Sequence, residues 1–240
     1  MNASERIIVA LDVDTEAEAR AIVDALGDMA PIYKVGLQWL TTAGPAPMRE
    51  LIAAGKQVFL DLKLFEIPNS VAAAVRAAGR QGVAMVTVHA SAGSAILHTA
   101  VDAARPWPAL KVLALTVVTS LGDADLREVG IEAGVDVQVL RLARLAEAAG
   151  CHGVIASPRE VAMLRAVLDP RMLIVTPGIQ FVGDAAAAPG RADTPAHAIG
   201  AGASHVVLGR TITQAADPRA VFVAVRDEVE RAWRNAPRNN

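Results

Sequence analysis

Short apolar runs rich in β-branched residues alternate with longer amphipathic stretches through the whole chain. A short apolar run bounded by polar or turn residues is typical of a strand buried on both faces, as strands are in parallel sheets. The runs that fit this description are Ile7–Leu11, Ile32–Val35, Gln57–Leu60, Met85–Val88, Val112–Val117, Gly153–Ala156, Leu173–Val175 and His205–Leu208. The pattern therefore predicts eight strands.

The stretches between these runs carry apolar residues at helical spacing. Helices are expected at Thr15–Leu26, Ala46–Ala54, Asn69–Gln81, Val137–Ala149, Pro158–Val167 and Pro218–Trp233. Thr15 and Ser157 stand where N-caps belong, because each precedes residues that suit a first helical turn. Strands that alternate with helices in this way indicate parallel βα units.

The number of repeats favours a closed (β/α)₈ barrel over an open doubly wound sheet. The chain has 240 residues, and barrels of about 250 residues commonly form one domain. The first predicted strand ends without a glycine-rich turn, and neither a complete G-x-G-x-x-G nor a G-x-x-x-x-G-K-[ST] motif occurs. We therefore expect one catalytic barrel domain over residues 1–240, with residues 235–240 as a frayed tail and Asp184–Asp193 as a long loop after the seventh strand.

Composition narrows the classes of function. Hydrophobic residues make up 53% of the chain but aromatic residues only 3%, so the core is expected to be aliphatic. A formal net charge of −2 without a run of Lys or Arg gives no signature of nucleic-acid or anionic-membrane binding. Because Cys151 is the one cysteine and neither a signal pattern nor a long apolar segment occurs, we expect a cytoplasmic protein without a disulfide or membrane span.

Polar residues gather where the predicted strands end. In a (β/α)₈ barrel the active site is built at the C-terminal ends of the strands, so these residues are the candidates for chemistry. In chain order they are Asp12, Lys34, Asp61, Lys63, His89, Thr119, Ser120, Thr176-Pro177-Gly178 and Gly209-Arg210.

Lys34, Asp61 and Lys63 interrupt otherwise apolar strands, where an unpaired charge is costly. Strand alternation places Asp61 and Lys63 on one face, toward the barrel mouth. A buried ion pair that only stabilises the barrel explains these two residues equally well. Adding Asp12 and Lys34 from neighbouring strands favours a ligand site, because apolar residues would stabilise a core as well as four charges.

Gly209 and Arg210 are typical of the phosphate site that barrels build after the seventh and eighth strands, and Pro177-Gly178 favours a matching turn. The alternative is an arginine that caps carbonyl groups at the barrel rim. His89 is interpreted as a packing residue rather than as an acid or base. The remaining histidines show no metal-ligand spacing; they are His98, His152, His197 and His205.

The stretch Asp61-Leu-Lys-Leu-Phe-Glu-Ile-Pro-Asn69 resembles the D-x-K-x-x-D-I-P-N signature of the orotidine 5′-monophosphate decarboxylases. Further landmarks follow in that family's order: Ala10-Leu-Asp12, Tyr33-Lys34-Val-Gly36, Thr87-Val-His89-Ala, Leu115-Thr-Val-Val-Thr119-Ser120, Val175-Thr-Pro-Gly-Ile179 and Val207-Leu-Gly-Arg210. The resemblance covers the chain from Ile7 to Asp217. Sugar-phosphate decarboxylases and aldolases of the same suprafamily share D-x-K-x-x-D, whereas the Ile-Pro-Asn continuation and Thr119-Ser120 favour the pyrimidine enzyme.

The resemblance implies a cofactor-free, metal-free enzyme that converts orotidine 5′-monophosphate to uridine 5′-monophosphate, the last step of de novo pyrimidine nucleotide synthesis. It assigns catalytic roles to Lys63 as proton donor, Asp61 beside the substrate carboxylate, and Lys34 in the charge network. It also implies a homodimer in which Glu66 reaches into the partner's site. The substrate-binding residues that it implies are Asp12, Lys34, Asn69, Ser70, Thr119, Gln180, Pro189, Arg191, Gly209 and Arg210.

The sequence departs from the family pattern at four positions. Phe65-Glu66 replaces the His-Asp of many bacterial relatives, and Gln180 and Pro189 replace Arg and Gln. Glu66 keeps the charge on a longer side chain, whereas Gln180 donates hydrogen bonds to phosphate without the charged fork of an arginine. Pro189 has no amide side chain, and Arg191 is the candidate to replace its contact.

Two other functions stay open at this point. One is a suprafamily relative that acts on a keto-sugar phosphate with Mg²⁺ at the same acids, and this function predicts metal dependence. The other is a barrel that binds a phosphate ligand without turnover. Binding of a nucleotide without its conversion distinguishes that barrel from both enzymes.

Overall fold

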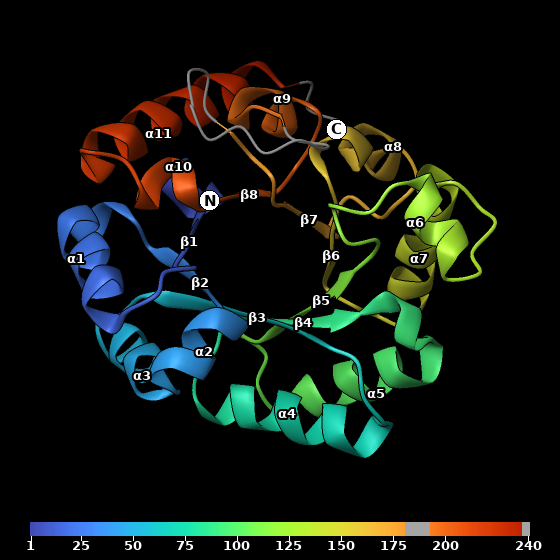
Figure 1. Cartoon of the computed structure of the whole chain (residues 1–240). Helices are drawn as coiled ribbons and strands as arrows, with labels where there is room; N and C mark the ends of the chain where they lie inside the picture. Colours follow the sequence, from blue (N-terminus) through green and yellow to red (C-terminus); the bar gives the residue numbers. More distant parts are fainter. Residues whose placement is uncertain (181–192, 237–240) are drawn as a thin grey trace.

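The computed structural model describes residues 1–180 and 193–236 of the chain. Within these residues, eight parallel strands close into a barrel in chain order, so that β1 pairs with both β2 and β8. The strands are β1 Ile7–Ala10, β2 Ile32–Gly36, β3 Gln57–Leu64, β4 Met85–His89, β5 Lys111–Leu115, β6 Gly153–Ile155, β7 Leu173–Thr176 and β8 His205–Leu208. Figure 1 looks along the barrel and shows this inner ring of strands within a ring of helices. The prediction of a (β/α)₈ barrel is confirmed.

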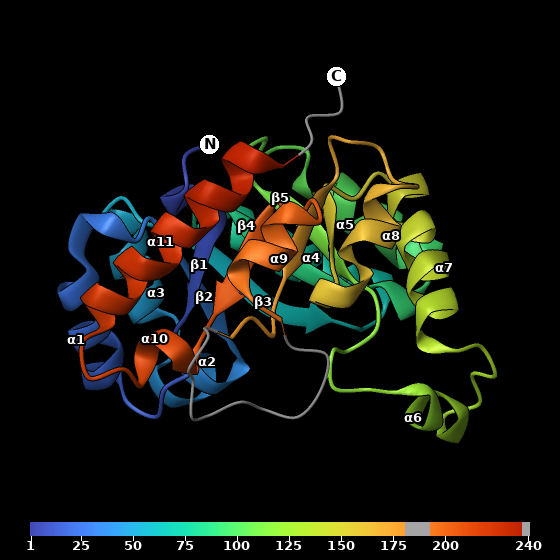
Figure 2. The same cartoon turned by 90° about the horizontal axis from the view of Figure 1, so that it is seen from above.

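Helices surround the barrel, and different helices mark its two ends. They are α1 Glu16–Leu26, α2 Leu37–Ala43, α3 Ala46–Ala53, α4 Pro68–Arg80, α5 Ser94–Ala104, α6 Asp123–Glu128, α7 Val135–Ala148, α8 Val161–Arg165, α9 Pro195–Gly200, α10 Arg210–Thr213 and α11 Pro218–Asn235. In the side view of Figure 2, the chain begins at the end of the barrel where α11 finishes, and α2 and α6 lie at the opposite end. That opposite end is where the strands terminate.

The two faces of each strand contribute to two apolar layers. Alternate side chains fill the barrel interior: Ile8, Ala10, Ile32, Phe59, Met85, Leu113, Leu115, Ile155, Val175 and Val207. Intervening side chains such as Ile7 and Val9 pack beneath the helices. Both layers are mainly aliphatic, as the low aromatic content predicted. Because Ile8 and Ala10 face inward, the same alternation directs Asp12 toward the interior at the mouth of the barrel.

Local sequence explains where several helices begin. Thr15 caps α1 in a capping box with Glu18, and Ser157 forms a capping box with Glu160 in the 3₁₀ turn before α8. Both expected N-caps are therefore confirmed. The sequence pattern does not predict α2, α6, α9 and α10, which have seven residues or fewer, nor α5, whose sequence SAILHTAVDAA is apolar on too many sides to show a stripe.

The third strand is longer than its apolar run. We expected Gln57–Leu60, but β3 continues to Leu64. Leu60 pairs with Val86 and Leu64 with Val88, so the three residues Asp61–Lys63 stand opposite Thr87 alone. Such a bulge redirects the side chains of the longer strand. The apolar pattern could not reveal this bulge. The bulge contains the charged residues Asp61 and Lys63, and these two residues interrupt the apolar pattern.

Two expectations fall largely outside the described residues. Of the expected loop Asp184–Asp193, only Asp193 is described, and it forms an isolated bridge with Ile179. Asn235, expected as the first residue of the tail, is the last residue of α11, and residues 237–240 lie outside the described residues.

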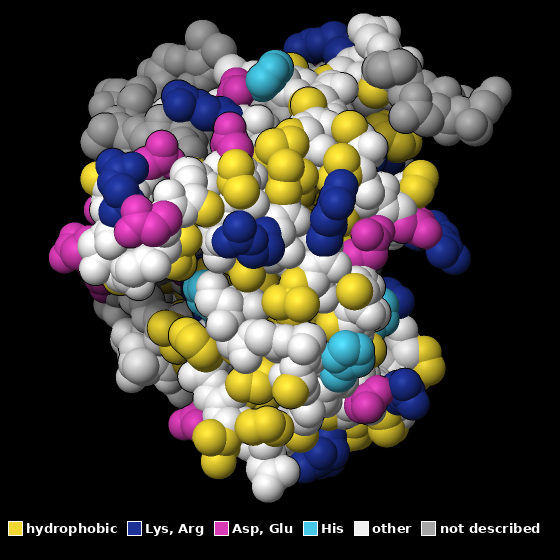
Figure 3. All heavy atoms as spheres, turned by 90° about the vertical axis from the view of Figure 1, so that its right-hand side faces the viewer, with side chains coloured by type: hydrophobic (Ala, Val, Ile, Leu, Met, Phe, Trp, Pro, Cys, Tyr) yellow, Lys and Arg dark blue, Asp and Glu magenta, His cyan; other side chains and the backbone are white. Residues whose placement is uncertain are grey.

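The outer surface is mixed in character. Figure 3 shows the side of the molecule that carries α7 and α8, where hydrophobic, charged and other side chains are interspersed. Among the helices of residues 1–180 and 193–236, none combines the length and apolar composition that crossing a membrane requires. The longer helices instead turn one apolar stripe toward the strands, as Ala19, Ile22 and Leu26 of α1 do.

We predict that His205 makes stability depend on pH. His205 begins β8 and is only 5% exposed. Burial, and secondarily the charge of Arg6, lower the pKa of His205 to about 4. The unfolded chain, with a histidine pKa of about 6.5, binds this proton first as the pH falls. This residue should therefore lower the free energy of unfolding by about 2 kcal/mol between about pH 7 and about pH 5.

Urea unfolding at both pH values tests this prediction. His205→Gln removes the titrating group, so its unfolding free energy should fall less than that of the wild type over the same range. His98→Gln, on the exposed side of α5, is the matched control and should behave like the wild type. An unchanged pH dependence in His205→Gln would contradict the assignment.

Candidate active site

Four charged side chains alternate in sign across the C-terminal ends of β1, β2 and β3. Lys34 donates hydrogen bonds to both carboxylate oxygens of Asp12, each 2.9 Å from Nζ. The same Nζ lies 3.7 Å from Oδ2 of Asp61. Lys63 completes the row, with its Nζ 2.8 Å from Oδ2 of Asp61. The row Asp12, Lys34, Asp61 and Lys63 therefore places every charge beside an opposite one, which offsets the penalty of burying it.

The row is shielded at its centre and open at both ends. The side chains of Lys34 and Asp61 are 11% and 12% exposed, whereas those of Lys63 and Asp12 are 41% and 44% exposed. Gly36 leaves room for this arrangement, because a Cβ there would lie 3.2 Å from Oδ1 of Asp12 and 3.4 Å from Nζ of Lys34. The ammonium of Lys63 can thus meet a ligand at the mouth while its neighbours hold it in place.

Thr87 fixes the two charges of β3. Its hydroxyl donates a hydrogen bond to Oδ1 of Asp61 at 2.9 Å and accepts one from the backbone N–H of Lys63 at 2.8 Å. Thr87 is completely buried, so water does not compete for either bond. Its hydroxyl therefore closes the bulge in β3 and orients the Asp61 carboxylate at the same time.

The backbone of Lys63 is strained. Its φ of 50° lies in the left-handed region, and within the described residues no other residue except glycine has a positive φ. A residue with a Cβ pays on the order of 1 kcal/mol for this conformation. Strain retained at a residue whose ammonium faces Asp61 at the barrel mouth indicates a position kept for chemistry.

Glu66 lies beyond the end of β3. It is exposed, and its Oε1 accepts a hydrogen bond from the backbone N–H of Ile67 at 2.6 Å. The flanking residues Phe65 and Ile67 are 64% and 62% exposed, and Leu37 at the start of α2 is 59% exposed. The structure therefore places this acid outside the charge row and beside exposed apolar side chains at the same end of the barrel.

Three further candidates surround the mouth. Asn69 and Ser70 follow Pro68 in the first turn of α4 and are exposed. Thr119 is half-buried in the loop after β5. All three come after strand ends, so they share the C-terminal end of the barrel with the charge row.

The phosphate-site candidates follow β7 and β8, which are neighbours in the barrel. Gly209 is the residue before α10, and Arg210 is the first residue of that helix and exposed. A Cβ on Gly209 would lie 3.7 Å from the Cβ of Ala10, so the backbone of the two adjacent strands is close here.

After β7, Gly178 adopts a φ of 77° and turns the chain toward Ile179 and Gln180. The backbone N–H of Gln180 donates a hydrogen bond to the carbonyl of Asp193 at 2.9 Å. Gln180 is thereby held near the end of β7. The other two candidates for this region, Pro189 and Arg191, lie outside the described residues.

His89 packs as predicted, but it does so within the site. Its ring stacks on Phe65 with 5.5 Å between ring centroids and 23° between the ring planes. Burial, and secondarily the charge of Lys63, lower the pKa of His89. The sequence analysis assigned no role to Thr87 of the same strand. The inward alternation of Met85, Thr87 and His89 is the signal that could have found it.

The two carboxylates at the barrel mouth are poorly suited to bind a divalent cation. Asp12 and Asp61 each accept from a lysine, so both carboxylates already have a cationic neighbour. Within the described part of the chain, no group of three or more His, Cys, Asp or Glu side chains could hold a metal ion.

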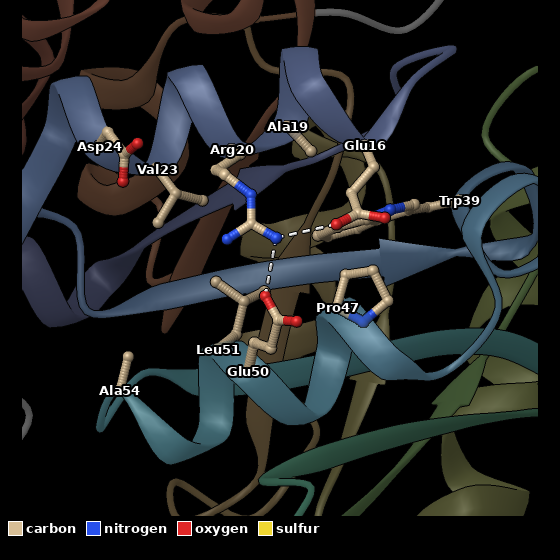
Figure 4. A pocket seen from close by; sticks show the side chains of 10 residues that line it. All are labelled: Glu16, Ala19, Arg20, Val23, Asp24, Trp39, Pro47, Glu50, Leu51 and Ala54. Carbon is tan, nitrogen blue, oxygen red and sulfur yellow. Dashed lines mark hydrogen bonds and ion pairs between the residues drawn. The ribbon is translucent and has the colours of Figure 1, made fainter.

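A separate hollow lies outside the barrel, between α1 and α3. Figure 4 shows Arg20 of α1 pointing into it and bridging Glu16 of α1 and Glu50 of α3, with donor–acceptor distances of 2.8 and 2.9 Å. The ion pairs span the space between the helices. Of the sequence-predicted site residues that the structure describes, none lines this hollow, so it is not the candidate active site.

Comparison with known proteins agrees with this geometry. Residues 5–225 match the family model described as the orotidine 5′-phosphate decarboxylase / HUMPS family. The chain is 46% identical over 237 residues to the orotidine 5′-phosphate decarboxylase of Moorella thermoacetica, covering 96% of this chain and 94% of the relative. It is 45% identical over 228 residues to the enzyme of the same name from Rhodopseudomonas palustris, covering 95% and 96%.

A solved structure is similar over the same extent. The crystal structure of orotidine 5′-phosphate decarboxylase from Lactobacillus acidophilus superposes with a TM-score of 0.83 at 37% identity, covering 93% of this chain and 98% of that one. The family resemblance of the Asp61–Asn69 stretch, the closed barrel and the full-length similarity point the same way. The chain belongs to the orotidine 5′-phosphate decarboxylase / HUMPS family.

Proposed function

We propose that the protein decarboxylates orotidine 5′-monophosphate to uridine 5′-monophosphate, in pyrimidine nucleotide synthesis. The observation that carries this proposal is the strained Lys63, whose ammonium lies 2.8 Å from the Asp61 carboxylate at the open mouth of the barrel. The full-length relatives named orotidine 5′-phosphate decarboxylase support the same reaction.

The substrate is anchored by groups at several strand ends. Its phosphate binds at Gly209 and Arg210, where an exposed guanidinium follows a glycine that lets the ligand approach the backbone. Asp12 and Lys34 contact the ribose hydroxyl groups, and Thr119 contacts the pyrimidine. Asn69, Ser70, Gln180, Pro189 and Arg191 complete the proposed binding set.

The chemistry concerns one carbon–carbon bond. When carbon dioxide leaves, the electron pair of the broken bond stays on carbon 6 of the pyrimidine. The ammonium of Lys63 favours this developing negative charge and then donates a proton to carbon 6. Asp61 holds Lys63 in position and lies beside the departing carboxylate, while the ammonium of Lys34 lies 3.7 Å from the same Asp61 oxygen.

Hydrogen bonds preorganise the Asp61–Lys63 part of the charge row. The Thr87 hydroxyl, the Asp61 carboxylate and the Lys63 ammonium are connected before substrate arrives. Little reorganisation is then needed as charge develops, and a preorganised charge in a partly dehydrated site acts more strongly than in water.

The functional unit in this proposal is a homodimer. Exposed apolar side chains at Phe65 and Ile67 flank Glu66, Leu37 is exposed at the same end of the barrel, and exposed apolar side chains favour a protein–protein contact. In a two-fold dimer the same surface meets itself, so each Glu66 would enter the partner's site next to Lys63. The longer side chain of Glu66, compared with the Asp of many relatives, is compatible with this reach.

We also infer a reducing compartment such as the cytoplasm. Cys151 is buried, and burial raises the pKa of its thiol to about 12. A protonated, inaccessible thiol without a cysteine partner needs no oxidising environment.

Turnover of orotidine 5′-monophosphate by the purified protein tests the proposed function. The wild type should consume it equally well with and without a chelator, and Lys63→Ala should lower kcat at least about a hundredfold by removing the proton donor. Lys111→Ala, at the N-terminal end of β5, is the matched control and should retain activity.

The unfolding free energy of Lys63→Ala separates chemistry from structure. It should stay within about 1 kcal/mol of the wild type, because the apolar layers are untouched. Loss of activity on chelation would favour the keto-sugar-phosphate alternative. Full activity of Lys63→Ala, or its unfolding, would count against Lys63 as the proton donor.

Mixing inactive subunits tests the role of Glu66. Lys63→Ala and Glu66→Ala proteins should each be inactive, but a mixed dimer would carry both defects in one site and neither in the other. Random reassortment should restore about a quarter of wild-type activity, because half the dimers are mixed and each has one intact site.

Asp61→Asn mixed with Lys63→Ala is the matched control. These two residues contact each other in one chain, so every site of that mixture is defective and activity should stay absent. If the Glu66→Ala mixture also stays inactive although mixed dimers form, Glu66 acts within its own chain.

A further inference from the structure

A hollow lined by three arginines lies at the N-terminal end of the barrel, opposite the candidate active site. It occupies about 650 Å³ where the chain enters β1, β7 and β8, and Arg6, Arg165 and Arg171 line it. In Figure 2 this is the end at which the chain begins and α11 finishes. Within the described part of the chain, no Asp or Glu lines the hollow.

Arg6 is buried but only partly bonded. It is 4% exposed, its Nη1 donates a hydrogen bond to the carbonyl of Ser204 at 3.2 Å, and its Nε is buried without a partner. The guanidinium carbon lies 3.3 Å from the centre of the Trp233 ring, and Trp233 itself is 41% exposed. Arg6 is therefore held rigidly by stacking, while part of its hydrogen-bonding capacity is unused.

Among the residues that the structure describes, Arg165 binds only neutral groups. Its guanidinium donates to the carbonyls of Gly202 at 3.2 Å, Pro170 at 3.3 Å and Met172 at 3.1 Å. These bonds orient the side chain, and no carboxylate of residues 1–180 or 193–236 pairs with its positive charge. Arg171 pairs with Asp169, and with a side chain 91% exposed it sits at the rim of the hollow.

The hollow therefore has a charge imbalance. Burial lowers the pKa of both Arg6 and Arg165, and the charge of Glu5 offsets this only in part at Arg6. A buried charge that is not fully paired is destabilising, and a bound anion would pair it. A purely structural role in tying loops together explains the carbonyl bonds of Arg165, but not the partnerless Nε of Arg6 in a hollow without acids.

We propose that this arginine hollow is a second ligand site, which binds a small molecule bearing a phosphate or diphosphate group. Arginine forks match phosphate oxygens, and two arginines line the hollow from different elements, Arg6 directly before β1 and Arg165 at the end of α8. The volume is within the range of about 300 to 1,000 Å³ typical of small-molecule sites. The exposed part of the Trp233 ring provides an apolar surface for the remainder of the ligand.

Calorimetric titration with inorganic pyrophosphate at low ionic strength tests the proposal. All proteins in the series carry Arg210→Gln, which weakens anion binding at the opposite end of the barrel. This protein should still bind one pyrophosphate per chain. Adding Arg6→Gln or Arg171→Gln should weaken binding about tenfold, the effect of losing a charged hydrogen bond.

Arg20→Gln is the matched control. It removes one positive charge from the outer surface between α1 and α3, far from the arginine hollow, and should leave pyrophosphate affinity unchanged. Because Arg171 is exposed, its substitution tests the site even if Arg6→Gln fails to fold. Pyrophosphate should also change the tryptophan fluorescence, and this change should disappear in Trp233→Phe.

Either of two results overturns the proposal. One is the absence of pyrophosphate binding in the Arg210→Gln protein. The other is an equal loss of pyrophosphate affinity in Arg171→Gln and Arg20→Gln. That result would mean that affinity depends on the net charge of the protein and not on the arginine hollow. Neither result bears on the decarboxylase proposal, since the two sites lie at opposite ends of the barrel.

Discussion

The hydrogen bonds of one buried hydroxyl group organise the reactive end of this barrel. Thr87 binds the Asp61 carboxylate and the Lys63 backbone together, and so stabilises the bulge in which β3 passes three residues opposite one of β4. The bulge imposes a left-handed φ on Lys63 and brings its ammonium against Asp61. Without this interaction, the bulge Asp61–Lys63 would lose the hydrogen bonds of Thr87 that tie it to β4, and Asp61 would keep its pairing with Gly36 of β2.

The remaining charges follow from regular strand geometry. Alternation along β1 and β2 carries the inward face from Ala10 to Asp12 and from Ile32 to Lys34. The charge row therefore lies directly above the apolar side chains of the barrel interior, on the same inward faces of the strands. Its net neutrality makes partial burial tolerable, and its open end presents the ammonium of Lys63, which Asp61 holds in one orientation.

The sequence predicted the regular strands and the residues at their ends, but not the short helices or the bulge in β3. Alternating runs located all eight strands, and the end of each run located Asp12, Lys34, Asp61 and Lys63. Short helices such as α10 carry too few residues for a stripe, and the extension of β3 is hidden by its own charges. Thr87 was missed because a threonine in a strand is ordinary until its hydrogen-bond partners are known.

The arginine hollow was missed because Arg6, Arg165 and Arg171 are far apart in sequence and meet only through barrel closure.

In the proposed function, the charge row and the glycine–arginine pair after β8 hold one nucleotide between them. A crystal structure of the protein with uridine 5′-monophosphate measures this directly. The account predicts the phosphate at Gly209 and Arg210 and carbon 6 of the pyrimidine next to Nζ of Lys63, with the Thr87–Asp61 bond unchanged. A nucleotide bound with its phosphate elsewhere, or with its ring turned away from Lys63, would contradict it.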